Sequence, residues 1–366
     1  MEINSNKTGR MQNGIDSSDF DRTKIYEQLE YDREPIGYTG KLPWLIQQQI
    51  GATNGIHYLD RIGKLKDYPV YDLPLPVVNK GLMLDIGNGW GRWLVAGANK
   101  GYIPIGIDIR LEFCKTAIQT LHNNNKNGYS VVADLKNLPF QDNIFDLVWS
   151  FSVIQHTHKQ RLLSCLAHID RILATGGFAF LEFPNKNGIR NRISNVKAAL
   201  PDADNYDSWC VRYYTIKEYK KIFNELFTNF EYHNHSFLGI GILPEDLKYV
   251  SFKNKIISSV SLLGSFMTKI IPGLKQLSDS IYIKSYKHPG SANEITDRDR
   301  LKLFHEAHNI NPTDNLNIRF LLRCPVTGDS LELSADRAKL FSKRAGFAYP
   351  VIDEIPIMIE SERQPI

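Results

Sequence analysis

The segment Leu84-Asp-Ile-Gly-Asn-Gly-Trp-Gly91 is rich in glycine and stands between two different hydrophobic patterns. Before it, the apolar run from Gly81 to Ile86 is typical of a buried parallel strand, and after it Arg92 to Lys100 is predicted to be a helix. Glycines let a backbone turn sharply and let a ligand approach peptide N–H groups at a helix N-terminus. The loop is therefore a candidate nucleotide site, although a plain tight turn has the same pattern.

Strand-like and helix-like segments alternate beyond this loop, which predicts a parallel sheet covered by helices on both faces. A Thr215–Glu218 capping box predicts a further helix up to Leu226. The other predicted strands are Tyr102–Ile107, Tyr129–Ala133, Phe145–Ser150, Phe178–Phe183 (ended by Pro184), Phe230–Phe237 and Ser280–Tyr286, and the other helices are Glu112–Asn123 and Lys159–Leu173, the latter ended by Thr175-Gly-Gly177.

The fold class expected from these segments is α/β, with a doubly wound, seven-stranded, mostly parallel sheet, a helical cap and a small C-terminal α+β or β-rich domain. An N-terminal tail and cap would occupy 1–75, and the sheet domain 76–286. An apolar, lid-like insertion is expected within that domain at 238–277. A linker at 287–316, with a short helix around Asp299–His308, would lead to the small domain at 317–366.

Composition places limits on the class of protein. The chain has 366 residues, 42% of them hydrophobic, and a net charge of +4, which neither requires nor excludes a polyanionic partner. Its four cysteines form no CxxC pair, and residues 1–21 lack the pattern of a signal peptide, so a cytoplasmic location is expected. The apolar stretch Ile256–Met267 is shorter than the roughly 20 residues that a membrane span needs.

The wider apolar segment Ile256–Ile271 is expected to pack as core or as a lid. An interfacial helix for a lipid-like acceptor is the alternative, but such helices usually carry more basic flanking charge. No stable membrane insertion is expected.

Acidic residues follow the second and third predicted strands. Asp108 comes about 20 residues after the glycine loop, where a carboxylate can accept both ribose hydroxyls, although aspartate also favours helix N-caps. Asp134-Leu135 can contact the amino group and face of an adenine, although a turn aspartate is the simpler interpretation. The fourth predicted strand opens into Phe151-Ser-Val-Ile-Gln-His156 at the edge where ligands bind in open α/β sheets.

The order of these residues resembles the class I S-adenosylmethionine-dependent methyltransferases, especially the branch that includes ubiquinone and sugar O-methyltransferases. The resemblance spans about Gly81–Asn185 and is weaker up to Tyr286. A dinucleotide loop would instead run GxGxxG, and no second nucleotide-binding half follows. The segments that carry the resemblance are Leu84–Gly91, Gly106-Ile-Asp-Ile109, Ala133-Asp-Leu135, Leu138-Pro-Phe140, Phe145-Asp-Leu-Val148 and Arg171–Gly177.

The resemblance implies S-adenosylmethionine as cofactor and S-adenosylhomocysteine as product. Asp85 and the glycine loop would hold the methionine part, Asp108 the ribose and Asp134 the adenine. Ser150 and Phe151 would line the cofactor. The full set of implied cofactor-binding residues is Asp85, Gly87, Gly89, Gly91, Asp108, Ile109, Asp134, Leu135, Ser150 and Phe151.

The candidate catalytic residue is His156, because an oxygen nucleophile benefits from a base and histidine titrates in the useful range. A loop histidine without a catalytic role is the alternative. His233 and His235 would share one face of a strand, but without further ligands we expect a packed or exposed pair and no metal. Candidates for substrate contact are Glu182, Asn185, Arg212, Tyr213 and Tyr214.

The C-terminal stretch Ile318–Ile359 resembles the small zinc-ribbon-like family that activates tRNA, rRNA and release-factor methyltransferases. Its anchors are Cys324-Pro325, Gly328, Tyr349-Pro350 and Asp353-Glu-Ile-Pro356. Arg319–Gly328 is predicted to be a strand and turn, and Phe347–Met358 two short strands around an Asp-Glu turn. Because Thr327 stands where the next cysteine would fall, no zinc is expected. The module would pack on the core in cis.

The function expected from the sequence is methyl transfer to a small-molecule or lipid-linked acceptor at oxygen. The alternatives are an RNA (tRNA or rRNA) methyltransferase with its activator-like domain in cis, and a non-catalytic cofactor-binding module. Ser150-Phe-Ser-Val stands where protein-glutamine methyltransferases have Asn-Pro-Pro-Tyr, which argues against amide methylation.

Overall fold

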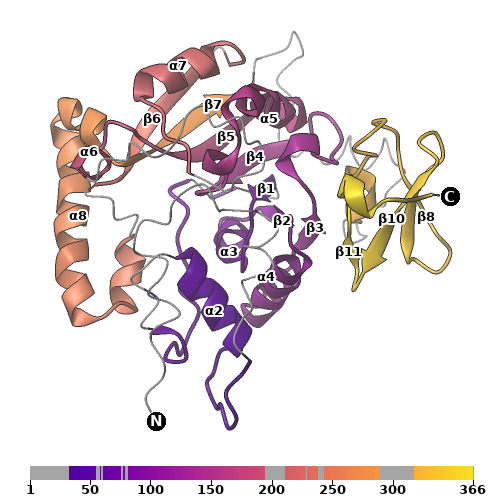
Figure 1. Ribbon diagram of the computed structural model, residues 1–366, viewed down its shortest axis with the longest axis horizontal. Helices are drawn as coiled ribbons and strands as arrows, with labels where there is room; N and C mark the ends of the chain where they lie inside the picture. Colours follow the sequence, from indigo (N-terminus) through magenta and orange to yellow (C-terminus); the bar gives the residue numbers. More distant parts are fainter. Residues whose placement is uncertain are drawn as a thin grey trace, which may run out of the picture.

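The computed structural model describes residues 33–54, 58, 61–75, 77–78, 81–193, 211–227, 229–237, 243–287 and 317–365. The chain forms one large sheet with helices on both faces and a small C-terminal sheet at one side (Figure 1). The expected tail at 1–21 and the expected helix at 299–308 lie outside the described residues.

The large sheet has seven strands in the order β3-β2-β1-β4-β5-β7-β6. Only β7 runs antiparallel to its neighbours, so the predicted doubly wound, mostly parallel sheet is confirmed. The strand order reverses between β1 and β4, which is where an open α/β sheet forms its ligand crevice. The strands are β1 (Leu82–Ile86), β2 (Ile103–Asp108), β3 (Tyr129–Val132), β4 (Phe145–Ser150), β5 (Leu173–Pro184), β6 (Asn229–Ser236) and β7 (Ser280–Tyr286).

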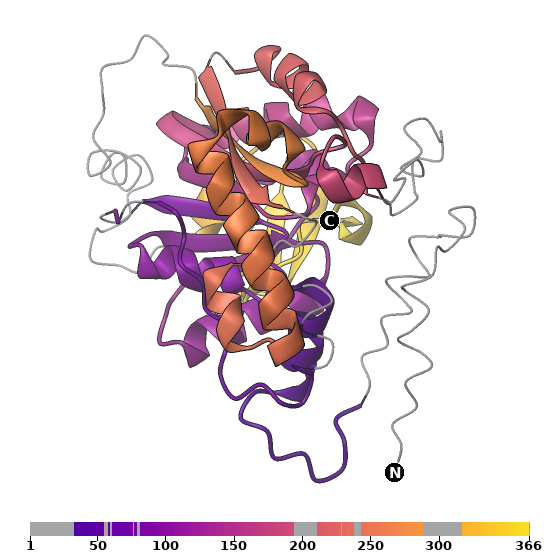
Figure 2. The same ribbon diagram turned by 90° about the vertical axis from the view of Figure 1, so that its left-hand side faces the viewer.

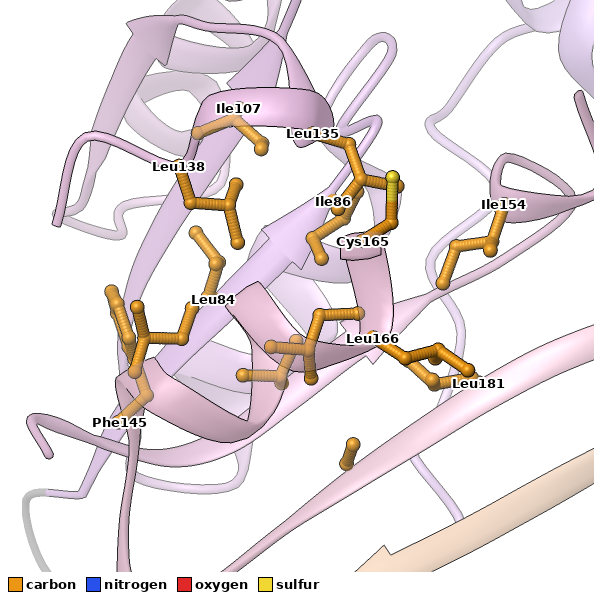
Figure 3. Packing of buried hydrophobic residues seen from close by; sticks show 14 of the residues in the cluster. Leu84, Ile86, Ile107, Leu135, Leu138, Phe145, Ile154, Cys165, Leu166 and Leu181 are labelled. Carbon is orange, nitrogen blue, oxygen red and sulfur yellow. The ribbon is translucent and has the colours of Figure 1, made fainter. Parts of the chain in front are cut away.

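Apolar side chains alternate between the two faces of β1 and bury a different layer of helices on each. Leu84 and Ile86 pack in one cluster with Leu166 of α5 (Figure 3), whereas Met83 packs with Trp93 of α3 on the other face. The helices are α2 (Trp44–Thr53), α3 (Arg92–Asn99), α4 (Leu111–Asn123), α5 (Lys159–Ile172), α6 (Ile189–Ile193), α7 (Ile216–Asn224) and α8 (Phe252–Ile270). The predicted capping box at Thr215 and Glu218 starts α7.

Strand β5 begins earlier than predicted. We expected Thr175-Gly-Gly177 to end the preceding helix, but α5 ends at Ile172 and β5 runs through the glycines. Leu173 pairs with Phe145 of β4, and the register shifts before Leu147. Gly176 has a φ of 78°, which residues with a side chain rarely adopt, so glycine here permits the irregular backbone where the register of β5 shifts.

The N-terminal part packs on the α3 side of the sheet through α2 and irregular segments. Trp90 of the glycine loop donates to the side-chain oxygen of Asn54 (Nε1 to Oδ1, 3.1 Å). The hydroxyls of Tyr58 and Tyr71 both donate to Asp246, each at 2.6 Å. Asp246 belongs to a 3-10 helix (Pro244–Lys248) just before α8, so the cap and the apolar insertion are tied together.

Helix α8 buries only one of its sides. Its residues Ser258, Ser261 and Thr268 are buried and Leu262 packs on a buried cluster, whereas most of its large apolar residues are exposed. Figure 2, which views the molecule from this side, shows α8 lying outermost. The remaining described 3-10 helices are Leu135–Asn137, Ile154–His156, Pro272–Leu277, Ile318–Leu321 and Glu360–Glu362.

The C-terminal unit is rich in short strands: β8 (Glu332–Leu333), β9 (Lys339–Ser342), β10 (Phe347–Ile352), β11 (Ile355–Pro356) and β12 (Gln364–Pro365). Asp353 and Glu354 have φ values of 50° and 63°, as the predicted tight turn between β10 and β11 requires. The strand predicted from Arg319 is wrong at its start, because Asn317 accepts from the Arg319 backbone N–H (3.2 Å) and begins a 3-10 helix.

This unit docks on the β3 edge of the large sheet. Ile357 bridges Val132 in parallel, and Leu322 bridges Phe140. Leu321, Leu340 and Tyr349 belong to the same buried cluster as the sheet residues, so the two apolar cores are continuous.

Candidate functional site

The glycine loop lies at the carboxyl end of β1, beside the point where the strand order reverses. Its three glycines all have positive φ, at 75°, 49° and 94°. A side chain at Gly91 would meet Ala117 of α4 at 2.9 Å, and one at Gly87 would collide with Val153. At Gly89 the nearest heavy atom, of the Thr53 side chain, would be 3.9 Å away, which is ordinary van der Waals contact, so this glycine is the least crowded of the three.

Asp85 is the most unusual residue of the site. Its side chain is fully buried, and neither carboxylate oxygen has a hydrogen-bond partner among the described residues. Burial raises the pKa of this carboxyl to about 8, against which the nearby Arg92 guanidinium acts, while Asp108 adds to the increase. Isolated buried carboxyls are costly unless paired, so the arrangement fits a cationic group of a ligand.

Asp108 ends β2 and faces the loop. Its Oδ2 accepts from the Gly89 N–H at 3.3 Å and its Oδ1 from the Arg110 N–H at 3.1 Å, and burial raises its pKa to about 6. Asp108 is not the N-cap of α4, because Arg110 holds that position without a side-chain capping bond; instead Asp108 accepts from two backbone N–H groups of the loop and the turn. The next residue, Ile109, is 41% exposed, which suits an apolar contact with a planar ligand.

Asp134 and Leu135 follow β3, where the sequence predicted them. Asp134 accepts from the Lys136 N–H at 3.0 Å and caps a 3-10 helix, while Leu135 is buried. Ser150, at the end of β4, is buried and donates to the Ile86 carbonyl at 3.4 Å. The residues predicted to bind the cofactor therefore lie at the carboxyl ends of β1 to β4.

Arg92 joins these residues to an aromatic wall that the sequence analysis did not identify. Its guanidinium carbon lies 4.5 Å from the ring centre of Phe151 and 5.1 Å from that of Trp93. Trp93 packs in turn on Trp149 at 4.9 Å. The position of Arg92, directly after the last glycine of the loop, was the available signal for its role.

A buried polar cluster lies beyond Phe151. Glu182 lies near the end of β5 and accepts from both the backbone N–H and the hydroxyl of Ser152, each at 3.0 Å, and burial raises its pKa. His235 of β6 packs edge-on against Phe151 at 5.0 Å and on Tyr282 at 4.8 Å.

The His235 ring is held neutral. Burial, helped by Arg92, lowers its pKa to about 3, and its Nε2 has no hydrogen-bond partner among the described residues. The expected histidine pair is therefore split: His235 is buried, while the side chain of His233 is 43% exposed and lies 3.6 Å from Glu231.

The other predicted residues form a second group beside this cluster. Arg212 donates to the carbonyl of His156 at 2.6 Å. Tyr214 bridges Asn185, whose amide nitrogen donates to the carbonyls of Gln276 (3.0 Å) and Ser278 (2.7 Å). The Asn185 side chain thus fixes the segment that follows α8, and Tyr213 lies half-buried in between.

Two absences concern the described residues only. Within the ranges given above, no three His, Cys, Asp or Glu side chains gather as a metal site would require. Across the same ranges, no helix has the length and apolar character to cross a membrane.

Comparison with known proteins identifies the domain around this site. Residues 84–181 match a family described as methyltransferase domain, which confirms the methyltransferase predicted from the sequence. This chain is similar in structure to a SAM-dependent methyltransferase of Thermotoga maritima. The match has 14% identity, covers 67% of this chain and 92% of that chain, and has a TM-score of 0.39. A structure of the complex between the Haloferax volcanii Trm112 methyltransferase activator and a methyltransferase is also similar. The match has 16% identity, covers 66% of this chain and 93% of that chain, and has a TM-score of 0.40.

A second similarity concerns a shorter part of the chain. A UPF0434 protein of Pseudomonas putida is 52% identical over 46 residues, which make up 13% of this chain and 75% of that protein. A UPF0434 protein of Pseudomonas savastanoi is 54% identical over the same length. The chain carries a methyltransferase domain at residues 84–181 and, over 46 of its residues, belongs to the UPF0434 family.

Proposed function

We propose that the chain transfers a methyl group from S-adenosylmethionine to an oxygen atom of a small-molecule or lipid-linked acceptor. The observation that carries this proposal is the buried, unpartnered carboxylate of Asp85 at the carboxyl end of β1. The positively charged amino group of the cofactor would be the partner that this carboxylate lacks. Asp108, at the next strand end, is placed to accept the ribose hydroxyls.

The residues around the loop would bind the rest of the cofactor. Gly89 has no side chain and is the least crowded glycine of the loop, so a ligand could lie against its backbone, and Ile109 and Leu135 would offer apolar contact to an adenine, with Asp134 beside them. When bound, the cofactor supplies an electrophilic methyl group on a sulfonium. Ser150 and Phe151 lie at the end of β4, next to the loop, and close this side of the site.

The acceptor would lie against the cluster beyond Phe151. Positioning supplies much of the acceleration of an in-line displacement, and the half-buried Phe151 ring, backed by the buried Trp93 and Trp149, would offer apolar contact to the acceptor. His235 offers a neutral imidazole with an unpartnered Nε2, which can accept a hydrogen bond from an acceptor hydroxyl. His156, predicted from the sequence, is the other candidate base, and Glu182, which is hydrogen-bonded to Ser152 and Ser280, would fix the loop after β4 beside the acceptor.

The C-terminal unit would act in cis, as a permanent support of the β3 edge. The apolar core of the unit is continuous with that of the large sheet, which favours this role. We propose that the UPF0434 similarity lies in this unit, which bears the anchors Cys324 and Tyr349. Burial raises the pKa of the Tyr349 hydroxyl, which lies 3.3 Å from the Cys324 sulfur, so both anchors are part of the buried core of the unit. The unit also gives some support to the RNA alternative.

The first test is thermal unfolding with S-adenosylmethionine, S-adenosylhomocysteine or NAD. A ligand at about 100 times its Kd stabilises by roughly 2.7 kcal/mol, which moves the midpoint by several degrees. We expect this shift with the first two ligands and its loss in Asp108→Ala. A shift with NAD alone would overturn the proposal.

The second test follows the methyl group. Protein with tritiated S-adenosylmethionine is incubated with separate lipid, RNA and small-molecule fractions of a bacterial extract. Label in the lipid or small-molecule fraction that hydriodic acid releases as volatile methyl iodide, as it does from O-methyl groups, would support the proposal. Label in RNA would establish the alternative, and cofactor binding without transfer to any fraction would favour the non-catalytic module. His156→Asn and His235→Asn, compared for kcat at unchanged cofactor affinity, identify the base.

A further inference from the structure

Helix α8 exposes a continuous stripe of large apolar side chains. The intervals along the stripe are three or four residues, so these residues lie on one side of the helix over its whole length. Single exposed apolar residues are common, but a row of this length marks an interaction surface. We call it the α8 stripe; it consists of Phe252 (79% exposed), Ile256 (57%), Val260 (53%), Leu263 (62%), Phe266 (54%) and Ile270 (60%).

The inward side of α8 has the opposite character. Ser258, Ser261 and Thr268 are buried, and the Ser261 hydroxyl donates to the Phe237 carbonyl at the end of β6. Gly264 lies against the Phe237 ring, where a Cβ would come within 2.3 Å. Apart from Leu262, the buried residues on the inward side are small and polar, whereas the stripe of large apolar residues faces out, the reverse of a surface helix that packs on its own core.

The charges of this segment are all positive. Between Ser251 and Ser278 there are four lysines, at 253, 255, 269 and 275, and no aspartate or glutamate. Lys253 and Lys255 stand in the first turn of α8, where the helix dipole disfavours cations. Their placement does not serve the stability of the helix, so it calls for a negatively charged partner.

We propose that α8 docks flat on an anionic lipid surface, with the α8 stripe among the acyl chains and the lysines at the head groups. A helix of 19 residues is about 28 Å long, enough to lie along the interface, and amphipathic helices with lysines beside an apolar face bind such surfaces. A second copy of this chain is a poorer partner, because pairing the two stripes would bring lysines together.

The docked face would lie close to the site. Leu262 of α8 packs on the cluster that contains Trp93, Trp149 and Tyr282, the wall beside which the acceptor is expected. Just before α8, Asp246 holds the hydroxyls of Tyr58 and Tyr71. Docking needs no methyl transfer, whereas delivery of a membrane-held acceptor to this wall rests on the function proposed above.

The experiment is co-sedimentation of the full chain with vesicles. Vesicles of phosphatidylglycerol and phosphatidylcholine are compared with vesicles of phosphatidylcholine alone, at low and high salt. We expect binding to the anionic vesicles that weakens with salt. The double variant Leu263→Ser/Phe266→Ser should bind at least about tenfold more weakly, because it lacks two apolar side chains that would be buried among the acyl chains. Val77→Ser/Val326→Ser, at residues 74% and 45% exposed elsewhere, should bind as the parent chain does.

The lysines are tested separately. Lys253→Gln/Lys255→Gln should lower binding to anionic vesicles about tenfold or more, because each basic residue near such a surface contributes about 1 kcal/mol. Lys343→Gln in the C-terminal unit, whose side chain is 76% exposed, is the matched control.

Two outcomes would overturn the inference: no binding of the parent chain to anionic vesicles, or equal binding by the α8 variants. A dimer in size-exclusion chromatography that Leu263→Ser/Phe266→Ser dissociates would assign the stripe to a second copy instead. The thermal shift with S-adenosylmethionine is measured on the same samples. A retained shift without vesicle binding rejects docking alone, and vesicle binding without a shift rejects the proposed function alone.

Discussion

The backbone N–H of Met358 donates to the carbonyl of Val132 at 2.7 Å, and this bond joins the C-terminal unit to the outermost strand of the sheet. Ile357 and Val132 pair in parallel, so β3 is not left as an open edge. On the other side of the contact, Asp142 Oδ1 forms ion pairs with Nη1 of Arg171 at 2.6 Å and with Nη1 of Arg323 at 2.8 Å. The unit is thus built into the fold.

We expect Ile357→Asp to destabilise the whole chain. Ile357 is 6% exposed and packs with Val132 and Cys114, so a carboxylate there loses apolar contact and is buried without a partner. The cost should be about 3 kcal/mol or more. Ile352→Asp, at a 42% exposed position of the same unit, is the control and should change little. Calorimetry should show one transition for both units; a separate transition of the C-terminal unit would contradict a shared core.

Asp85→Asn should stabilise the ligand-free chain and abolish the cofactor shift. A neutral amide avoids the cost of ionising a buried carboxyl, so the free energy of unfolding near pH 8 should rise by about 1 kcal/mol or more. At the same time the charge that would pair the cofactor is lost. Thermal unfolding with and without S-adenosylhomocysteine measures both effects, and a less stable variant with an intact shift would contradict the role given to Asp85.

The contribution of Asp85 to the stability of the ligand-free chain should fall as pH rises from about 4 to 8. Over this range the Asp85 pKa of about 8 in the folded state exceeds its ordinary value of 3.8, so the folded state binds more protons than the unfolded state. The free energy of unfolding then decreases by up to about 1.4 kcal/mol per pH unit, and the contribution is fully lost above the folded pKa. Urea unfolding of the parent chain and of Asp85→Asn, compared at several pH values, isolates this contribution.

Cofactor affinity should rise with pH over the same interval. Pairing with an ammonium group requires ionised Asp85, so binding must displace a proton below about pH 8. The dissociation constant should therefore decrease by up to about tenfold per pH unit as pH approaches 8 and then level off. Calorimetric titration in buffers of different ionisation enthalpy should detect proton release, and a pH-independent affinity would show that Asp85 is already ionised.

Two glycine variants should separate folding from binding. Gly91→Ala places a Cβ at 2.9 Å from the Ala117 backbone at a φ of 94°, so α3 and α4 must move apart and the chain should lose about 3 kcal/mol. Gly89→Ala meets nothing closer than 3.9 Å and should cost about 1 kcal/mol, because an L residue at φ 49° is only mildly strained. If Gly89 faces the cofactor, this milder variant should show the larger loss of cofactor affinity.

Much of the architecture was determined by the sequence alone. The apolar runs and the glycine loop set the alternation of strands and helices, because period and turn chemistry act over a few neighbouring residues. The sequence also predicted that the carboxylates at 85, 108 and 134 lie along one edge of the sheet. Each stands at or just after the end of a predicted strand, and parallel strands bring their carboxyl ends to one edge. Local signals also specified the capping box of α7 and the turn at Asp353.

Other features were decided only by tertiary structure. The alternation of β6 placed His233 and His235 on one face, but only the packing of Phe151 and Tyr282 on His235 buried one ring and left the other near solvent. Arg92 lies against Asn54, Tyr71 and Phe151, which come from three separate segments of the chain. The apolar content of α8 was plain in the sequence, yet which side faces the protein depends on Phe237 and the end of β6. These outcomes depend on contacts between residues far apart in the chain, and burial, pKa and exposure follow from such contacts and not from local pattern.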